Sequence, residues 1–396
     1  MNSDLVFMLR LLGGVITESE FPEEVPNTDW NKILEISKRH NITNIIGYGV
    51  MSGKYNVPEP IKTEFMKGVS VCIQIDTIQQ NAIKVIFDEY EKNAIDYMPL
   101  KGTVLKKMYP QSDMRNMSDA DILIKKKDYE SAQKVLVHLG YTFVGESDHE
   151  FNFKKDPFIK IELHKHLVPS YNEDLYAYYG DGWKLAKPLE KSYRYELSNE
   201  DFFIYLFVHF VKHYRDAGVG IKHILDLWLY TKKVTDINLE YVSEQLNHMN
   251  LGVFFKNICT MMECWFEERE YDELSGEITG FIISSGVFGT LKNSASASAI
   301  RTHMDKDITK AGKNKYLNLV FPPFIYMKQI FPVLEKAPVL LPFMWIVRLI
   351  KGALFKRHNI SYHINKTNSV DDDYIQKYME HMNDVGIDIY NGRKKS

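Results

Sequence analysis

The sequence predicts an α+β fold, in which a small mixed β-sheet with flanking helices lies between two helical regions. Short β-type runs are confined to residues 96–164, where they alternate with a helical stretch. On either side of this segment, apolar residues recur at helical spacing. The 396 residues suffice for two or three domains. We therefore expect a helical region at 1–95, an α/β core at 96–190 and a helical domain at 191–396.

The first region is expected to be largely helical. Apolar residues follow helical spacing at Trp30–Arg39, and a long mixed pattern without proline runs from Ile61 to Tyr90. Because no clear strand run interrupts these patterns, the first region is expected to add no strand to the sheet.

The α/β core contains four β-type runs. A helical stretch at 128–139 separates the second run from the third and ends at Gly140, a residue typical of helix C-termini. Runs this short predict a small sheet. They are DYMPL at 96–100, DADILI at 119–124, YTFV at 141–144 and FIKIELH at 158–164.

The last region returns to helices. Ser198 is expected to cap the first of them, with Asp201 three residues later and the apolar run FFIYLFVHFVKHY behind it. Gly218 and Gly220 are expected to end that helix. The small, polar stretch NSASASA at 293–299 predicts a loop. Further helices are expected at 221–232, 238–248 and 253–268.

The most apolar stretch of the last region runs from Pro338 to Phe355. It is interrupted by Pro342, Arg348 and Lys351, too many breaks for a bilayer-spanning helix, so we expect no integral membrane insertion. The run from Pro342 to Arg357 is expected to form a buried helix that packs on the rest of the domain. The alternative is a helix in a membrane interface, with its arginines and lysines reaching the head groups.

Composition excludes several kinds of partner and compartment. The 49 basic and 52 acidic residues give a net charge of −3, which provides no overall field for nucleic acid or an acidic membrane, and we expect no DNA partner. The cysteines are Cys72, Cys259 and Cys264, without CxxC spacing, which fits a reduced cytosol better than a disulfide framework. The N-terminus lacks the features of a signal peptide. A cytoplasmic protein is expected.

Lys101, Gly102 and Thr103 follow a short extended stretch and precede a helical one. In that position, backbone N–H groups and the positive end of a helix point at any anion above the glycine. A triphosphate would fit there, with the Thr103 hydroxyl as a further contact. The alternative is that Gly102 is an ordinary turn glycine.

Two aspartates stand two residues apart in the run DADILI. Asp119 and Asp121 therefore leave the same face of the predicted strand. Neighbouring unpaired carboxylates repel each other unless a divalent cation neutralises them, and oxygen ligands of this kind suit Mg²⁺ or Mn²⁺. We interpret the pair as metal ligands. The alternative is a solvated strand edge.

A third carboxylate, Glu162, lies on the polar side of the alternating run at 158–166. If this run is a strand beside DADILI, Glu162 reaches the same site, and three carboxylates can hold two metal ions. His164 shares the face of Glu162 and is expected to contact the nucleotide or to orient Glu162.

These motifs together resemble the DNA polymerase beta superfamily of nucleotidyltransferases. More narrowly, the chain is similar to a largely uncharacterised family of bacterial nucleotidyltransferases with an LKG element, an arginine four residues before a D-x-D strand, and a later E-L-H strand. The resemblance covers roughly residues 95–355 and includes the helical half. It rests on KGT at 101–103, Arg115, SDADILI at 118–124, IELH at 161–164, HFVKH at 209–213, KHILDLWL at 222–229, and FPP to PFMWIVRLI at 321–350.

The resemblance implies transfer of a nucleoside monophosphate from a triphosphate such as ATP to an unknown acceptor, with release of pyrophosphate. Asp119, Asp121 and Glu162 would then be catalytic residues and ligands of Mg²⁺ or Mn²⁺. The acceptor could be a small molecule, a protein or an RNA. The family usually has a second glycine or a serine where Thr103 stands, a departure that keeps a hydroxyl.

Further nucleotide contacts are expected beside these motifs. Lys101 and Arg115 can offset the charge of a triphosphate, and Ser118 directly precedes the aspartate pair. Each of these residues can equally be an ordinary surface or structural side chain. His209 and His213, spaced i, i+4 on one helix face, and Lys222 and Asp226 on the next helix, are expected to line the cleft.

Three rival functions stay open at this point. A toxin-type or drug-modifying nucleotidyltransferase, acting on tRNA, protein or a small molecule, carries comparable elements. A non-catalytic nucleotide-binding or scaffold protein would bind the triphosphate without turnover. A metal-dependent hydrolase that uses Glu162, His164, His166 and the helix histidines predicts tightly bound zinc.

Overall fold

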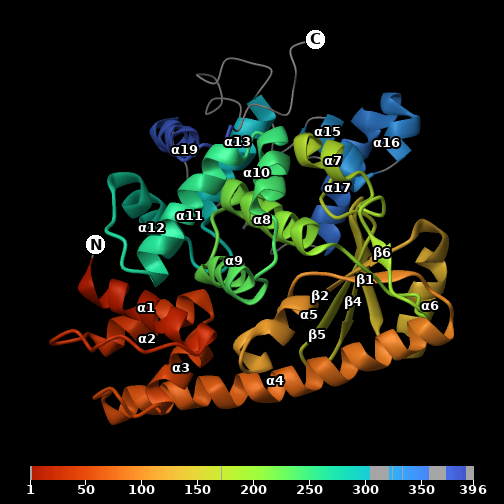
Figure 1. The fold of residues 1–396 in the computed structure, drawn as a ribbon. Coiled ribbons are helices and arrows are strands. Elements are labelled where there is room, and N and C mark those ends of the chain that lie inside the picture. The colour runs from red at the N-terminus through yellow and green to blue at the C-terminus, as the bar shows by residue number, and fades with distance from the viewer. Residues whose placement is uncertain are drawn as a thin grey trace.

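The computed structural model describes residues 2–170, 172–303, 321–322, 324–331, 333–355 and 372–388. Within these residues, helices predominate and a five-stranded sheet lies at one side of the molecule (Figure 1). The long helix α4 runs along the base from the N-terminal helices to the sheet, and the helices that follow the sheet fill the centre (Figure 1). The predicted α+β fold, with helices on both sides of a small mixed sheet, is confirmed.

The N-terminal region forms four helices, as its patterns predict. Asp29 caps the second helix, because its side chain accepts a hydrogen bond from the backbone N–H of Lys32 at 3.2 Å. The fourth helix has 34 residues and reaches the sheet with its C-terminal half. The helices are α1 (Ser3–Thr17), α2 (Trp30–His40), α3 (Thr43–Met51) and α4 (Glu59–Lys92).

The sheet has the strand order β1-β2-β5-β4-β3. Strands β2 and β5 are parallel, and the other neighbours are antiparallel. One face carries apolar side chains, among them Ile122 and Ile161, which pack against α4 and α6. The other face carries the polar side chains. The strands are β1 (Tyr97–Pro99), β2 (Ala120–Ile124), β3 (Thr142–Glu146), β4 (Glu150–Lys155) and β5 (Ile159–His164).

Strand β4 was not among the runs that the sequence predicts. Its residues EFNFKK bury Phe151 and Phe153 on the side of α4 and α6, while Asn152 lies between them on the polar face. The alternation was present, but it spans few residues and ends in two lysines. Pairing with β5 on one side and β3 on the other stabilises the strand, and no local pattern reports such pairing.

Short elements connect the sheet to the helices. Helix α6 corresponds to the helix predicted at 128–139 and ends before Gly140, whose φ is +84°. The tight segment after Gly102 forms one helical turn followed by 3₁₀ turns. These elements are α5 (Gly102–Leu105), η1 (Lys106–Met108), η2 (Ser112–Met114), η3 (Lys126–Asp128), α6 (Tyr129–His138), α7 (Glu173–Tyr179), β6 (Lys187–Pro188) and β7 (Tyr195–Glu196).

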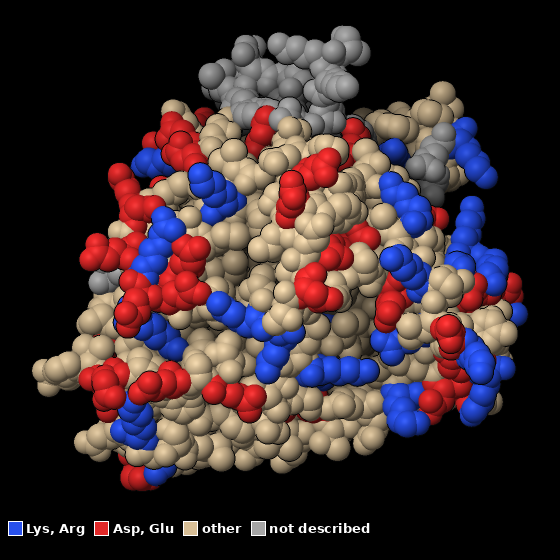
Figure 2. All heavy atoms as spheres, in the orientation of Figure 1, with Lys and Arg blue, Asp and Glu red and all other residues tan. Residues whose placement is uncertain are grey.

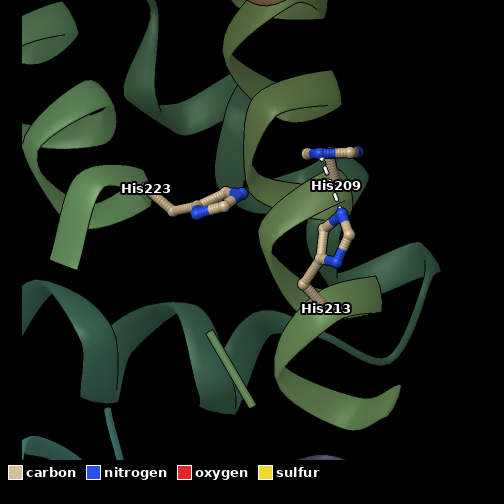
Figure 3. Close-up of side chains that lie close together, drawn as sticks. All are labelled: His209, His213 and His223. Atoms are coloured by element: carbon tan, nitrogen blue, oxygen red, sulfur yellow. Dashed lines mark hydrogen bonds between the residues drawn. The ribbon is translucent and has the colours of Figure 1, made fainter. Parts of the chain in front are cut away.

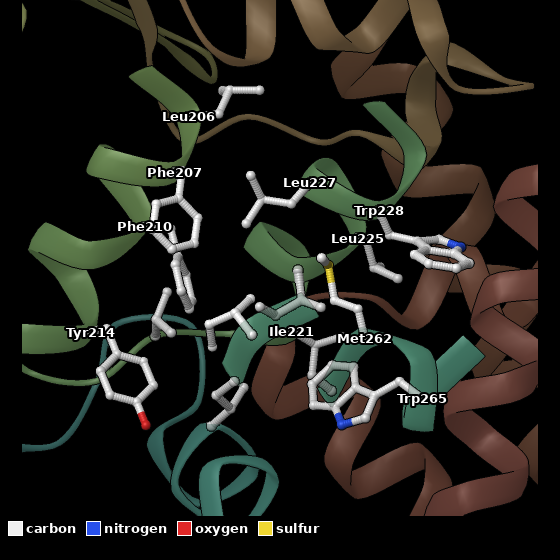
Figure 4. Packing of buried hydrophobic residues seen from close by; sticks show 14 of the residues in the cluster. Leu206, Phe207, Phe210, Tyr214, Ile221, Leu225, Leu227, Trp228, Met262 and Trp265 are labelled. Atoms are coloured by element: carbon white, nitrogen blue, oxygen red, sulfur yellow. The ribbon is translucent and has the colours of Figure 1, made fainter. Parts of the chain in front are cut away.

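The central helices form one apolar core. Figure 4 shows how Phe207 and Phe210 of α8 meet Leu227 of α9 and Met262 of α11. Ser198 caps α8 by accepting the backbone N–H of Asp201 at 3.1 Å, as predicted. The helices are α8 (Asn199–Asp216), α9 (Ile221–Lys233), α10 (Leu239–His248), α11 (Gly252–Phe266), α12 (Glu273–Ser285) and α13 (Leu291–His303).

The predicted loop at 293–299 is wrong, because these residues belong to helix α13. Ala295, Ser296 and Ala297 are buried, and α13 packs on α8 and α19. Alanine favours helix, and small side chains allow neighbouring helices to approach closely. Serine has a weaker intrinsic preference, so packing rather than composition decides this segment.

The C-terminal elements include an exposed apolar helix. The run at 342–357 was expected to be buried, and for the described side chains of α17 that expectation is wrong. Phe343 is 59%, Ile346 55% and Ile350 52% exposed. Within the described residues, no helix is long and apolar enough to cross a membrane. The elements are α15 (Phe324–Ile330), α16 (Val333–Lys336), η5 (Pro338–Leu340), α17 (Leu341–Phe355) and α19 (Asp372–Asp384).

The helices at the two ends of the chain share buried side chains. Phe7, Leu12 and Ile46 from the first region belong to the same hydrophobic cluster as Phe207 and Trp265. Helix α1 packs on α9 and α11. The division of the chain at residues 95 and 190 stays a prediction from sequence.

Candidate active site

A cavity of about 400 Å³ lies between the polar face of the sheet and helices α8 and α9. Carboxylates, cations and imidazoles line it together, so charged groups of both signs meet at one place. Its charged and imidazole lining consists of Asp119, Asp121, Glu150 and Glu162; Lys101, Arg115, Lys212 and Lys222; and His40, His149, His164, His209, His213 and His223.

The strand register brings the predicted carboxylates together. Asp121 of β2 lies directly opposite Glu162 of β5, as expected if these two runs are neighbouring strands. Asp121, Glu162 and His164 each offer a ligand atom, and these atoms lie within 4.8 Å of one another. The two strands therefore bring together, from residues far apart in sequence, groups that could hold a cation.

Asp121 is the most strongly held carboxylate of the site. Lys101 donates to its Oδ1 at 2.5 Å, and Nε2 of His164 lies 2.8 Å from the same oxygen. Burial alone would raise the pKa of Asp121, but Lys101 and His164 hold that pKa well below its usual range. Hydrogen bonds to Asp121 and Glu162 raise the pKa of His164 despite its burial. Asp121 is therefore ionised and fixed in place.

Asp119 directly precedes β2 and is half-buried. It forms no hydrogen bond or ion pair within the described part of the chain. Burial, together with the carboxylates of Asp121 and Glu162, raises its pKa to about 7. Asp119 thus lacks a paired positive charge, and a divalent cation with oxygen ligands would supply one. The donor set of Asp119, Asp121 and Glu162 therefore fits Mg²⁺ or Mn²⁺.

The Lys101–Gly102–Thr103 segment has a different geometry from that expected. The unusual backbone belongs to Lys101, whose φ is +45°, and this conformation aims its side chain at Asp121. A Cβ on Gly102 would lie 2.6 Å from Sδ of Met117, so close packing accounts for the glycine. Thr103 donates its hydroxyl to the backbone oxygen of Leu100 at 2.6 Å and does not line the cavity.

Arg115 and Asp226 form a buried ion pair behind the carboxylates. Nε of Arg115 donates to both carboxylate oxygens of Asp226, at 2.7 and 2.9 Å. Tyr109 donates to the same carboxylate at 2.8 Å. Arg115 also lines the cavity, whereas Asp226 does not. The pair thus ties the segment before β2 to helix α9.

Lys222 of α9 lines the cavity beside Arg115. Its ammonium group donates to the side chain and the backbone oxygen of Asn116. Burial, reinforced by the nearby Arg115 guanidinium, lowers the pKa of Lys222 to about 7. An anion in the cavity would restore the charged form of this lysine.

The predicted helix histidines line the cavity wall opposite the sheet. His209 and His213 lie one turn apart on α8, with their Nε2 atoms 3.1 Å apart. His223 of α9 joins them (Figure 3). Burial lowers the pKa of His209 and His213 well below the usual range and that of His223 to about 4. All three imidazoles are therefore neutral at neutral pH.

Sequence reasoning missed five charged or imidazole residues of the cavity lining, one of which is His40 at the end of α2. Glu150 is the first residue of β4, and His149 directly precedes that strand. The strand was not predicted, and its signal was the alternation of the EFNFKK run. His223 stands inside the KHILDLWL segment, but its sequence neighbours do not show that it faces His209. Lys212 had no signal beyond its place beside His213. Only packing of α8 and α9 on the sheet brings these residues together.

Of the remaining predicted residues, one lines the cavity and another does not. Ser118 is exposed and lines the cavity. His166, part of the rival hydrolase hypothesis, lies outside the cavity lining, with its ring 5.2 Å from that of Tyr176. The rival set of Glu162, His164, His166 and the helix histidines is thus not assembled as a unit.

The charges of the molecular surface give no sign of a large polyanion partner on the face that Figure 2 shows. Acidic and basic side chains are interspersed over the elements of this face (Figure 2). This distribution agrees with the net charge of −3. Any strong attraction for phosphate on this side of the molecule must therefore be local.

Comparison with known proteins gives one match. A family model described as an uncharacterised nucleotidyltransferase matches residues 26–267, more than half of the chain. That range includes both carboxylate strands and the helices that carry the three histidines. No curated protein and no solved structure shows a significant match.

Proposed function

The chain belongs to this uncharacterised nucleotidyltransferase family, and from that premise we propose that it transfers a nucleoside monophosphate from a nucleoside triphosphate to an acceptor. The acceptor oxygen attacks the α-phosphorus, the bond from that phosphorus to the bridging oxygen breaks, and pyrophosphate leaves. The proton of the acceptor hydroxyl passes to a carboxylate of the site. A small molecule, a protein or an RNA can supply such a hydroxyl.

The observation that carries this proposal is the Asp119 carboxylate, which lies beside Asp121 and Glu162 without a hydrogen bond or ion pair of its own in the described structure. Opposite them the same cavity presents Arg115 and Lys222. A triphosphate with a bound divalent cation would complement both kinds of charge in the cavity. Its phosphates would pair with the basic residues, and its cation would pair with the acidic ones.

The position of each residue in the cavity suggests its role in the reaction. Asp119, Asp121 and Glu162 would hold Mg²⁺ or Mn²⁺, which when bound neutralises the charge of the triphosphate. Arg115 and Lys222 bind the phosphates. Glu162, which is less buried than Asp121, accepts the proton of the acceptor.

Positioning accounts for most of the expected catalysis. His164 and Lys101 fix Asp121 from two directions, so the carboxylate needs no reorganisation when the substrate arrives. The cavity holds both reactants in one place, which removes much of the entropic cost of bringing them together. Little covalent chemistry is required of the protein.

The substitution Asp119→Asn tests the proposal. We expect it to lower nucleotide transfer about 100-fold or more, since it removes a ligand from the site. The fold should persist, because Asp119 makes no hydrogen bond within the described residues. Purified protein is incubated with Mg²⁺ or Mn²⁺ and each labelled triphosphate, alone and with cell extract, and pyrophosphate release and labelled product are measured.

The matched control is Glu130→Gln, which changes an exposed carboxylate on α6 that pairs with Lys134. It should leave the rate unchanged. Pyrophosphate release that survives in both Asp119→Asn and Asp121→Asn would refute the assignment. Triphosphate binding without turnover in the wild type, with extract present, would favour a binding-only protein instead.

A further inference from the structure

Three histidines from two helices converge on the wall of the cavity. His209 and His213 of α8 place their Nε2 atoms 3.1 Å apart. His223 projects from α9 toward this pair (Figure 3). Its ring centroid lies 5.7 Å from that of His209 and 5.4 Å from that of His213. One nitrogen of each ring lies within 4.8 Å of the other two.

The spacing of the three rings suits a single small ion. Zinc binds imidazole nitrogen at about 2.0–2.1 Å, and a tetrahedral angle then separates two such nitrogens by about 3.3 Å. The His209–His213 pair is already close to this separation. His223 supplies the third nitrogen from the neighbouring helix, which is how two packed helices commonly build a metal site.

Hydrogen bonding among the described side chains does not account for the cluster. The contact between His209 and His213 occupies one nitrogen of each ring. Nδ1 of His223 is buried and has no hydrogen-bond partner. A buried polar atom without a partner destabilises the fold, so hydrogen bonding does not explain why the His223 ring is buried here.

We propose that His209, His213 and His223 bind a transition-metal ion, with zinc the first candidate, and leave its fourth position open to the cavity. Imidazole ligands favour such ions, whereas the oxygen ligands of the carboxylate cluster favour Mg²⁺ or Mn²⁺. The cavity would then hold two metal sites of different chemistry. An open position accepts a water or a substrate oxygen, as in other zinc sites with three protein ligands.

Neighbouring charges set the expected strength of this site. Lys101 and Lys212 line the same cavity and oppose a cation there. We therefore expect an ion that a chelator removes reversibly, unlike the ion of a closed structural zinc site. The inference does not rest on nucleotide transfer, because metal retention is measured without any substrate.

The test measures metal directly. Full-length protein, purified without a polyhistidine tag, should contain zinc by elemental analysis and lose it to a chelator. Metal-free protein titrated with Co²⁺ should develop a visible absorption band, which zinc then abolishes. In His223→Asn we expect Co²⁺ affinity to fall roughly tenfold or more, because one of three ligands is lost.

Two comparisons guard against indirect effects. His138→Asn changes an exposed histidine on α6 and should bind Co²⁺ like the wild type. Asp121→Asn should also keep zinc, which separates this site from the carboxylate cluster. Circular dichroism reports whether each variant folds, and His213→Asn serves if His223→Asn does not. Absence of both zinc and the cobalt band overturns the proposal, as does a band that persists in both histidine variants.

A second observation, independent of the first, concerns the outer face of helix α17. A surface helix normally turns polar residues to water. Here the exposed side chains are apolar and recur at helical spacing: Phe343 at 59%, Ile346 at 55% and Ile350 at 52% exposed. Val339, just before the helix, is 86% exposed. Trp345 faces inward, where its Nε1 donates to the backbone oxygen of Pro322 at 2.8 Å.

The sequence of this segment is rich in basic residues. After Glu335, residues 336–357 contain no acidic residue, and their basic residues are Lys336, Arg348, Lys351, Lys356 and Arg357. The rest of the sequence has 44 basic and 52 acidic residues, so this concentration of basic residues is local. An exposed apolar stripe flanked by lysine and arginine matches the surface of an anionic bilayer, where apolar groups enter the acyl boundary and cations meet the head groups.

We infer that α17 docks this protein on the surface of anionic membranes without spanning them. The helix would lie in the plane of the interface, with Phe343, Ile346 and Ile350 toward the lipid. Its 15 residues correspond to about 22 Å of helix, enough for an interfacial contact. The same stripe supplies specific residues for the membrane-interface alternative that the sequence leaves open.

Sedimentation with vesicles tests this inference. We expect the full chain to bind vesicles that contain phosphatidylglycerol and to bind phosphatidylcholine vesicles much less, with added salt weakening the interaction. The double substitution Phe343→Glu and Ile346→Glu should abolish binding while leaving the thermal unfolding transition in place, because both side chains are exposed.

The matched control is Val137→Glu, which adds a carboxylate at an exposed apolar position of α6, 58% exposed and outside the stripe. It should bind vesicles like the wild type. Equal sedimentation of the double variant, or no binding to anionic vesicles at all, overturns the inference. A dimer in solution that the double variant abolishes would assign the stripe to a second copy of this chain and overturn it as well.

Discussion

Asp121→Asn is expected to lower the rate of nucleotide transfer about 1000-fold, the largest effect on activity of any single substitution in the cavity. Asp121 lies opposite Glu162 and accepts from both Lys101 and His164. An amide keeps the shape of the side chain but removes its charge. The site then loses its best-ionised carboxylate, and Lys101 and His164 lose the group that positions them.

The same substitution should also affect stability. Lys101 and His164 are largely buried, and removing their charged partner leaves positive charge poorly compensated, which costs up to about 3–5 kcal/mol. Rates should therefore be measured as pyrophosphate release per folded molecule, with the folded fraction taken from circular dichroism. Asp88→Asn, at an exposed pair with Lys84 on α4, is the control for both measurements. A rate within tenfold of the wild type would remove Asp121 from the catalytic set.

Arg115→Met is expected to destabilise the fold by about 3–5 kcal/mol, because it leaves the buried carboxylate of Asp226 without its bidentate partner. The side chains of this pair are only 12% and 5% exposed, so water replaces the lost contacts poorly. Tyr109 still donates to Asp226 and offsets part of the loss. Urea unfolding followed by circular dichroism measures the change.

Two further variants separate the charge effect from loss of packing. Lys134→Met breaks an exposed pair on α6 and should change the free energy of unfolding by less than about 0.5 kcal/mol. The double variant Arg115→Met and Asp226→Leu removes both charges and should recover much of the lost stability. Equal stability of Arg115→Met and the wild type would show that the pair contributes little.

The spacing of apolar and polar residues was enough to predict most helices and strands. It was also enough to predict the carboxylates at the centre of the site. The spacing of Asp119 and Asp121 placed them on one strand face, and the alternation around Glu162 placed it on the polar side of another. Both inferences depend only on the period of a strand, which is a property of consecutive residues. The parallel pairing of β2 and β5 then set Asp121 opposite Glu162.

The predictions from sequence failed where contacts with residues distant in the sequence determine the local structure. The NSASASA segment is helical because its small residues fit against α8 and α19. Strand β4 exists because β5 and β3 pair with it on both sides. In each case the local preference was weak, so tertiary contacts determined the outcome.

The roles of the basic residues also required the tertiary structure. Lys101 was expected to meet phosphate, and the structure pairs it with Asp121. Arg115 and Asp226 were expected at the nucleotide independently of each other, and they form one ion pair. A sequence reports which charges are present, whereas the energy of a charge depends on the distance and burial of its partner.

Consecutive residues were enough to predict a small mixed sheet with carboxylates on one face and helices before and after it. The periods of strands and helices are local, so a short stretch of sequence reveals them. The sequence did not show that α8 and α9 close over those carboxylates, that His223 joins His209 and His213, or that the apolar stripe of α17 faces outward. These features depend on which surfaces pack together, and packing is a property of the whole chain.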